Sequence, residues 1–339
     1  MPELLFKAVI CSDCFQGFKI RTLSFKNSIY VKCRSIFHVV ECIRNVFILQ
    51  NPFPSMKAYA FSPGHVTGFF SIGADLQGSI GAGFCVEKGV KTTVKAKTSK
   101  TNKLELALNG HTNRLPTSHA VVRKYLELSE KPRSLSIVHK AELPVGYGFG
   151  MSGAGALSLS LALNKALKTR LSALECAKIA HEAEIECGTG LGTVVAERFG
   201  GFGVRTEPGD FEKYERIKFS NKLKAVLAPL APLDTSNIIR DEGWQTRIMG
   251  IGRACVRDLL RNPKAEQFIT LSRLFATESG LAEGQVLNAM NASGGSMAML
   301  GRSVFVLTEK PRNAVSILKN YCKKVIVTKI STKGARLIK

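Results

Sequence analysis

The stretch "LPVGYGFGMSGAGALSLSLALN", residues 143–164, places five glycines between an apolar strand and an apolar helix. Glycine inside a chain element costs stability, so a run of glycines indicates that a ligand or another backbone segment approaches very closely. The helix that follows would expose unpaired N–H groups and a partial positive charge at its first turn. This stretch therefore predicts a site for an anion.

Three kinds of phosphate-binding loop can be compared with this stretch. A P-loop ends in Gly-Lys-Ser/Thr, but Gly150 is followed by Met-Ser-Gly without a lysine. The spacing of Gly148, Gly150 and Gly153 matches a dinucleotide loop, but the acid expected about 20 residues later would fall in a helix near 171–175. A nicotinamide enzyme therefore stays open only as an alternative, and we favour a longer glycine-serine loop around a triphosphate.

The composition is that of a globular protein, with 45% apolar and 22% charged residues among 339. The formal charge of +22 raises the question of nucleic acid. The basic residues are spread along the chain, and the densest run, 88–103, suits the solvated face of an edge hairpin. A basic RNA-binding protein remains an alternative, but we do not expect nucleic acid as a partner. We expect no membrane span or export signal, and a cytoplasmic location.

The first 55 residues differ from the remainder of the chain. They hold four of the nine cysteines, show no sustained periodicity and end in "NPFPS", after which Met56 opens a clear strand. Cys11 and Cys14 lack a second pair at matched spacing, so we do not expect a zinc site. We expect residues 1–55 to be an atypical N-terminal extension, either an accessory segment or sequence translated from upstream of the true start.

From Met56 onward, strand and helix signals alternate, which predicts an α+β protein in two lobes with a break near Ala231. "SALE" at 172–175 is a capping box that starts a helix. Strands are expected at 57–61, 83–97 (a hairpin turning near Lys88-Gly89), 103–108, 134–143, 200–207, 215–219, 303–309, 323–330 and 335–339. Helices are expected at 115–128, 153–168, 172–187, within a mainly helical region at 235–290, and at 311–321.

The loop pattern P-x-G-x-G-x-G-x-S resembles the second motif of the GHMP kinases, a family of small-molecule kinases. "SPGHVTGFF" (62–70) and "NASGGSMAMLGRSVFVL" (291–307) resemble the first and third motifs, in the same order. The resemblance implies a ribosomal-protein-like N-terminal lobe at 56–230 and a ferredoxin-like C-terminal lobe at 231–339. It also implies ATP and Mg²⁺ as cofactors, and a homodimer.

The same resemblance assigns the nucleotide site. Ser152 and Glu184 are the expected metal ligands and, with Thr193, the expected catalytic residues. Glu182 and Glu186 leave the same helix at quite different angles from Glu184. The residues expected to bind ATP are Pro144, Gly146, Gly148, Gly150, Ser152, Gly153, Ala154 and Gly155.

Within the family, "PGHVTGFF", "GSIGAGFC" (78–85) and "AHEAEIECGTGLGTVVAERFGGFGVR" (180–205) resemble the archaeal pantoate kinases. This implies phosphorylation of (R)-pantoate by ATP to 4-phosphopantoate, on the archaeal route to coenzyme A. Another GHMP kinase of the homoserine or mevalonate type is the alternative. The residues expected to bind the substrate are His65, Ser79, His181, Arg205 and Thr235.

Thr193 departs from the family pattern. Many family members carry an aspartate in this loop, suited to accept the hydroxyl proton, whereas threonine cannot act as a base at neutral pH. Either proton transfer is late and needs no dedicated base, or another acid such as Asp75 takes the role, or activity is weak. We prefer the first, because phosphoryl transfer passes through a loose transition state in which positioning and charge neutralisation dominate.

Overall fold

The structure, a computed structural model, describes residues 23–25, 28–30, 56–73, 77–112, 115–233, 238 and 241–339. Its contacts divide the chain into two compact units, Met1–Ser55 and Met56–Lys339. In the first unit, β1 (Leu23–Phe25) and β2 (Ser28–Tyr30) form an antiparallel pair. Asp75 and Thr235 lie outside the described residues.

The second unit contains two sheets. In the described residues, the larger sheet has seven strands in the order β13-β3-β4-β6-β5, with β7 on β4 and β8 on β7. Its pairs are antiparallel except the parallel pair β5–β6. Its strands are β3 (Met56–Ile72), β4 (Ser79–Thr98), β5 (Lys103–Leu108), β6 (Arg133–Ala141), β7 (Phe202–Arg205), β8 (Tyr214–Arg216) and β13 (Arg336–Ile338).

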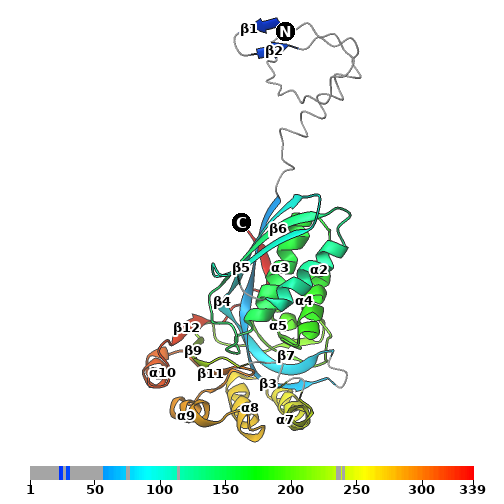
Figure 1. Cartoon of the computed structure of the whole chain (residues 1–339). Coiled ribbons are helices and arrows are strands. Elements are labelled where there is room, and N and C mark those ends of the chain that lie inside the picture. Colours follow the sequence, from blue (N-terminus) through cyan, green and yellow to red (C-terminus); the bar gives the residue numbers. More distant parts are fainter. Residues whose placement is uncertain are drawn as a thin grey trace. The chain divides into compact units, whose positions relative to one another are not determined.

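Helices α2 (Pro116–Glu127), α3 (Met151–Leu167), α4 (Ala173–Cys187) and α5 (Thr193–Phe199) lie together on one face of this sheet (Figure 1). The predicted capping box is confirmed at the start of α4. The Glu175 N–H donates to Ser172 Oγ at 3.1 Å, and the Ser172 N–H donates to the Glu175 carboxylate at 2.7 Å. The predicted start of a helix near Pro116 is also confirmed, since α2 begins at this residue. Proline suits the first turn of a helix, where its missing N–H costs no hydrogen bond.

The second sheet has the order β10-β11-β9-β12 and is antiparallel. Its strands are β9 (Lys224–Ala231), β10 (Ser296–Met297), β11 (Arg302–Thr308) and β12 (Ile326–Lys329). The expected helical region contains α7 (Glu242–Arg261), α8 (Ala265–Glu278) and α9 (Gly284–Ser293), and α10 (Pro311–Leu318) follows β11. The boundary expected between 230 and 231 stays a prediction, but the chain enters the second sheet earlier, at Lys224.

The prediction of a hairpin that turns near Lys88-Gly89 is wrong. β4 runs on as one strand from Ser79 to Thr98 and pairs with β3 over most of its length. The pairing shifts between Pro63 and Gly64, where Pro63 faces Gly89 and Gly64 faces Val86. The ladder takes up the extra residues of β4 as a bulge, and a bulge is a place where a strand tolerates proline. The sequence signals of a turn therefore mark an irregularity within a longer strand.

The two sheets share one apolar core. Phe69 of β3, Phe84 of β4, Phe202 of β7, Phe268 of α8 and Phe305 of β11 are all buried. The ring centroids of Phe84 and Phe305 lie 5.3 Å apart, and those of Phe202 and Phe268 lie 4.7 Å apart, in edge-on arrangements favoured by aromatic rings. α7 and α8 also pack on β3. These contacts join the two sheets into one unit and hold the loops between them in place.

Candidate active site

The alternate spacing of the glycines in the loop follows from the backbone conformation at these positions. Gly146, Gly148 and Gly150 have φ values of +84°, +78° and +69°, the left-handed region that side chains disfavour. Gly150 is the N-cap of α3, and no side chain hydrogen-bonds to this end of the helix. The first N–H groups of α3 are therefore free to bind an anion. These features support the predicted role of the loop.

The third glycine-rich segment, 291–307, packs against this loop. A Cβ on Gly148 would stand 2.8 Å from the Ala298 carbonyl oxygen, and a Cβ on Gly301 would overlap the backbone of Tyr147. The first segment, 62–70, is also adjacent, because the His65 N–H donates to the Phe149 carbonyl at 3.0 Å. The three segments singled out from the sequence thus meet at one place.

A cavity of about 650 Å³ opens beside the loop. It is lined by Gly146, Gly148, Gly150, Ser152 and Gly155 of the loop and α3, and by His65, Ser79, Thr193 and Arg205 among the other predicted residues. Pro144, Gly153, Ala154, His181 and Glu184 do not line it. A volume of this size is in the range of small-molecule sites.

His65, Ser79 and Arg205 come together at one part of the cavity wall. Arg205 is 2% exposed, its Nε donates to the Ser79 carbonyl at 3.4 Å, and its Nη1 has no partner in the described residues. Burial lowers the pKa of Arg205 to about 10, so it stays charged at neutral pH. A buried guanidinium with a free N–H suits a carboxylate ligand.

His65 lies buried in the same wall. Its Nδ1 lies 3.2 Å from Thr67 Oγ1, and its Nε2 has no partner in the part of the chain that the structure describes. Burial, and then the charge of Arg205, hold the pKa of His65 well below its usual value. The ring is therefore neutral, and its Nε2 can donate or accept one hydrogen bond with a ligand, depending on the tautomer.

Among the residues expected to bind the substrate, His181 does not line the cavity. Its Nε2 lies 3.2 Å from the Gln77 carbonyl, and its ring stands edge-on to Phe211 at 5.5 Å. Burial lowers its pKa. Since the ring does not line the cavity, a direct contact with a bound substrate has no support from the geometry.

Ser152 and Glu184 are linked through two threonines that the sequence analysis missed. Ser152 Oγ lies 3.3 Å from Thr117 Oγ1, which lies 3.0 Å from Thr189 Oγ1. Thr189 in turn donates to Glu184 Oε1 at 2.9 Å. Burial raises the pKa of Glu184, which is 1% exposed. Thr117 follows Pro116 at the first turn of α2, and this capping context was the available signal.

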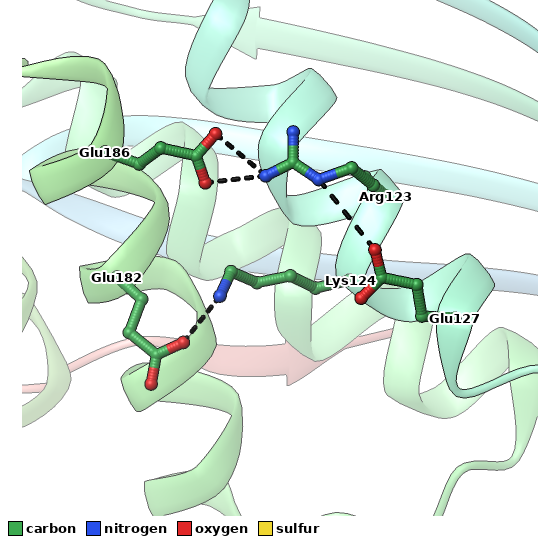
Figure 2. Close-up of polar contacts among 5 residues, drawn as sticks. All are labelled: Arg123, Lys124, Glu127, Glu182 and Glu186. Atoms are coloured by element: carbon green, nitrogen blue, oxygen red, sulfur yellow. Dashed lines mark hydrogen bonds and ion pairs between the residues drawn. The ribbon is translucent and has the colours of Figure 1, made fainter.

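The acids on either side of Glu184 have no part in this network. Glu186 accepts two hydrogen bonds from Arg123 Nη2, at 2.8 and 2.6 Å, and Glu182 pairs with Lys124 at 2.7 Å (Figure 2). Both pairs join the exposed surfaces of α2 and α4. The expected difference in direction between Glu184 and its two neighbours is therefore confirmed, and only Glu184 turns inward.

Glu197 is a second buried acid that the sequence analysis missed. It is 0% exposed, and neither carboxylate oxygen has a hydrogen-bond partner in the described residues. Burial, and then the charge of Glu184, raise its pKa well above the usual value. It follows Thr193 by one turn of α5, in a helix whose Val194, Val195 and Ala196 are also buried. A lone acid in an apolar helix was the signal.

The residues present fit a magnesium nucleotide. Mg²⁺ in kinases is held by one or two carboxylates together with phosphate oxygens, and Glu184 and Ser152 provide hard oxygen ligands beside the loop. Within the described ranges, no group of three His, Cys, Asp or Glu forms a metal cluster of the protein's own.

None of the helices described there is both long and apolar enough to span a bilayer.

Comparison with known proteins identifies the family of this chain. Residues 117–201 match the model of the GHMP kinases N terminal domain. The pantoate kinase of Methanocaldococcus jannaschii is 33% identical over 270 residues, covering 77% of this chain and 97% of that protein. A phosphotransferase related to the CoA biosynthesis pathway has a similar structure, with a TM-score of 0.73, 27% identity, and coverage of 84% of this chain and 99% of that chain.

The mevalonate diphosphate decarboxylase MDDEF, solved in complex with MVAPP, AMPPCP and magnesium, shares the fold with a TM-score of 0.66. It is 13% identical, and the match covers 84% of this chain and 99% of that chain. The motif order, the left-handed glycine loop and these matches lead to one conclusion. The chain belongs to the pantoate kinase family of GHMP kinases.

Proposed function

We propose that this enzyme transfers the γ-phosphoryl group of ATP to the primary hydroxyl of (R)-pantoate, giving 4-phosphopantoate and ADP for coenzyme A synthesis. The observation that carries the proposal is the shared cavity, in which the left-handed glycine loop and the buried Arg205 line the same 650 Å³ space. The loop fits a polyphosphate, and a buried guanidinium fits a carboxylate. Pantoate carries such a carboxylate, as do homoserine and mevalonate, and the similarity to the pantoate kinase of Methanocaldococcus jannaschii favours pantoate among these acceptors.

In this proposal the backbone N–H groups of the loop and the first turn of α3 bind the phosphates. Arg205 pairs with the pantoate carboxylate, and Ser79 and neutral His65 hydrogen-bond its remaining polar groups. Glu184 and Ser152 would hold Mg²⁺, which when bound neutralises charge on the phosphates. His181 and Thr235 are further proposed contacts of the substrate.

The reaction forms a bond between the pantoate hydroxyl oxygen and the γ-phosphorus and breaks the bond from that phosphorus to the oxygen that leaves with ADP. The hydroxyl proton is released to solvent late in the step. Thr193 lines the cavity and positions the acceptor but takes no proton. The family resemblance also leads us to propose a homodimer in the cytoplasm.

The test is ADP release with Mg²⁺ and ATP, measured with pantoate, homoserine, mevalonate or shikimate as the acceptor. Of these four acceptors, only pantoate should support ADP release. Arg205→Met should raise the KM for pantoate about 30-fold or more, because unpairing a buried charged group costs about 2 kcal/mol or more. Arg216→Met, which removes an exposed arginine of β8, is the matched control. Turnover without pantoate, or an unchanged KM in Arg205→Met, would contradict the assignment.

A further inference from the structure

Glu197 and Glu184 approach each other across Gly153. A Cβ built on Gly153 would stand 2.9 Å from Glu184 Oε2 and 3.0 Å from Glu197 Oε2. The two oxygens are therefore at most about 6 Å apart, with the bare Cα of Gly153 beside the space between them. A side chain at this position would enter that space, so glycine keeps it open.

The wall between this carboxylate pair and the cavity is thin. Gly150 and Gly190 line the cavity, and both touch the pair. A Cβ on Gly150 would stand 2.7 Å from Glu197 Oε1, and a Cβ on Gly190 would stand 2.5 Å from Glu184 Oε2. Two glycines thus separate the acids from the space beside the phosphate loop, and neither places a side chain in the way.

The pair lacks the charge compensation that buried acids require. Glu184 accepts a hydrogen bond from Thr189, whereas both oxygens of Glu197 have no partner in the described residues. Two carboxylates that are both out of water repel each other, and an unpaired buried charge is costly. The described surroundings of Glu197 thus lack the partner that a divalent cation would supply.

We propose that Glu197 is a second carboxylate ligand for the divalent cation that accompanies the nucleotide, binding it jointly with Glu184 across Gly153. This inference rests on the proposed function, since the cation is the one that ATP brings. Ser152 and Glu184 then form one side of the cation site, and Glu197 forms the side beneath the loop.

The test uses the full chain and Mn²⁺ as the probe, with bound Mn²⁺ measured by electron paramagnetic resonance, with and without AMPPCP. Glu197→Gln and Glu184→Gln should each weaken Mn²⁺ binding about tenfold or more. Glu182→Gln removes an exposed acid of the same helix as Glu184 and should have no effect. Glu197→Asp keeps the charge and should bind Mn²⁺ more tightly than Glu197→Gln.

Thermal unfolding distinguishes a cation ligand from a structural acid. Without metal, Glu197→Gln should melt at the same temperature as the wild type or higher, because a buried acid without a hydrogen-bond partner has been removed. With excess Mn²⁺, the wild type should gain more stability than the variant. A Glu197→Gln protein with wild-type Mn²⁺ affinity, or one that is equally destabilised with and without Mn²⁺, would overturn the inference.

The outcome for Glu197 is separable from that for the proposed function. If wild-type protein phosphorylates pantoate and Glu197→Gln binds Mn²⁺ normally, this inference alone fails. If Mn²⁺ binding falls in the variant while wild-type protein turns over no pantoate, the cation site stands and the substrate assignment fails.

Discussion

His139 gives a quantitative prediction for the pH dependence of stability. It lies on β6, is 2% exposed, and is enclosed by Thr92 Oγ1 at 2.8 Å from Nδ1 and Ser118 Oγ at 3.2 Å from Nε2. Burial lowers its pKa to about 4. The folded protein therefore keeps this ring neutral under conditions in which the unfolded chain, with a pKa of about 6.5, takes up a proton.

The sign and size of the effect follow from these two pKa values. Above about pH 6.5 both states hold a neutral ring, and His139 has no effect on the pH dependence. As the pH falls from about 6.5 to 4, only the unfolded state gains the proton, so the free energy of unfolding decreases. A difference of about 2.5 pKa units corresponds to about 3 kcal/mol at 25 °C.

The measurement is urea unfolding of wild type and His139→Gln between about pH 7 and pH 4. Glutamine does not titrate. The free energy of unfolding should therefore fall by about 3 kcal/mol more in the wild type than in the variant over this pH range. The comparison removes the contributions of other groups, such as His65 and His181. His119→Gln, at an exposed position of α2, should behave like the wild type. Parallel pH profiles for His139→Gln and wild type would refute the reasoning.

Three further predictions concern the loop, the cap and the proton. Gly148→Ala should weaken AMPPCP binding about tenfold or more in calorimetry, because a left-handed φ and the Ala298 carbonyl both oppose a side chain there. Ser172→Ala should lower the free energy of unfolding by about 1 kcal/mol and leave turnover unchanged, since it removes the α4 cap. Thr193→Asp should change kcat less than about tenfold, and an increase of several orders of magnitude would show that a base is needed.

The sequence predicted the features that depend on local rules. The alternating glycines of 146–150 permit the left-handed backbone that the loop adopts, and the Ser172–Glu175 box has a fixed spacing, so both could be recognised without tertiary contacts. The continuous β4 could not, because Lys88-Gly89 has the local signature of a turn and only pairing with β3 shows that the strand continues.

The part of the candidate site that was missed depends on tertiary contacts. Thr117 and Thr189 are 72 residues apart, and only the packing of α2 on α4 brings their hydroxyls to 3.0 Å. The apolar neighbours of Glu197 hint at burial, but only the packing of α5 against α3 and β3 shows that its carboxylate lies close to Glu184. Nor does the sequence show that the His181 ring stands edge-on to Phe211, and the role of His181 in binding the substrate stays a prediction.

The phenylalanine core between the sheets has a consequence for dissecting this protein. A fragment ending before Lys224 would leave Phe69, Phe84 and Phe202 without Phe268 and Phe305, and each exposed ring forfeits about 2 kcal/mol or more of burial. Such a piece would aggregate instead of folding alone. Residues 56–339 should accordingly melt in a single cooperative transition, and engineered truncations or domain exchanges must keep both halves together.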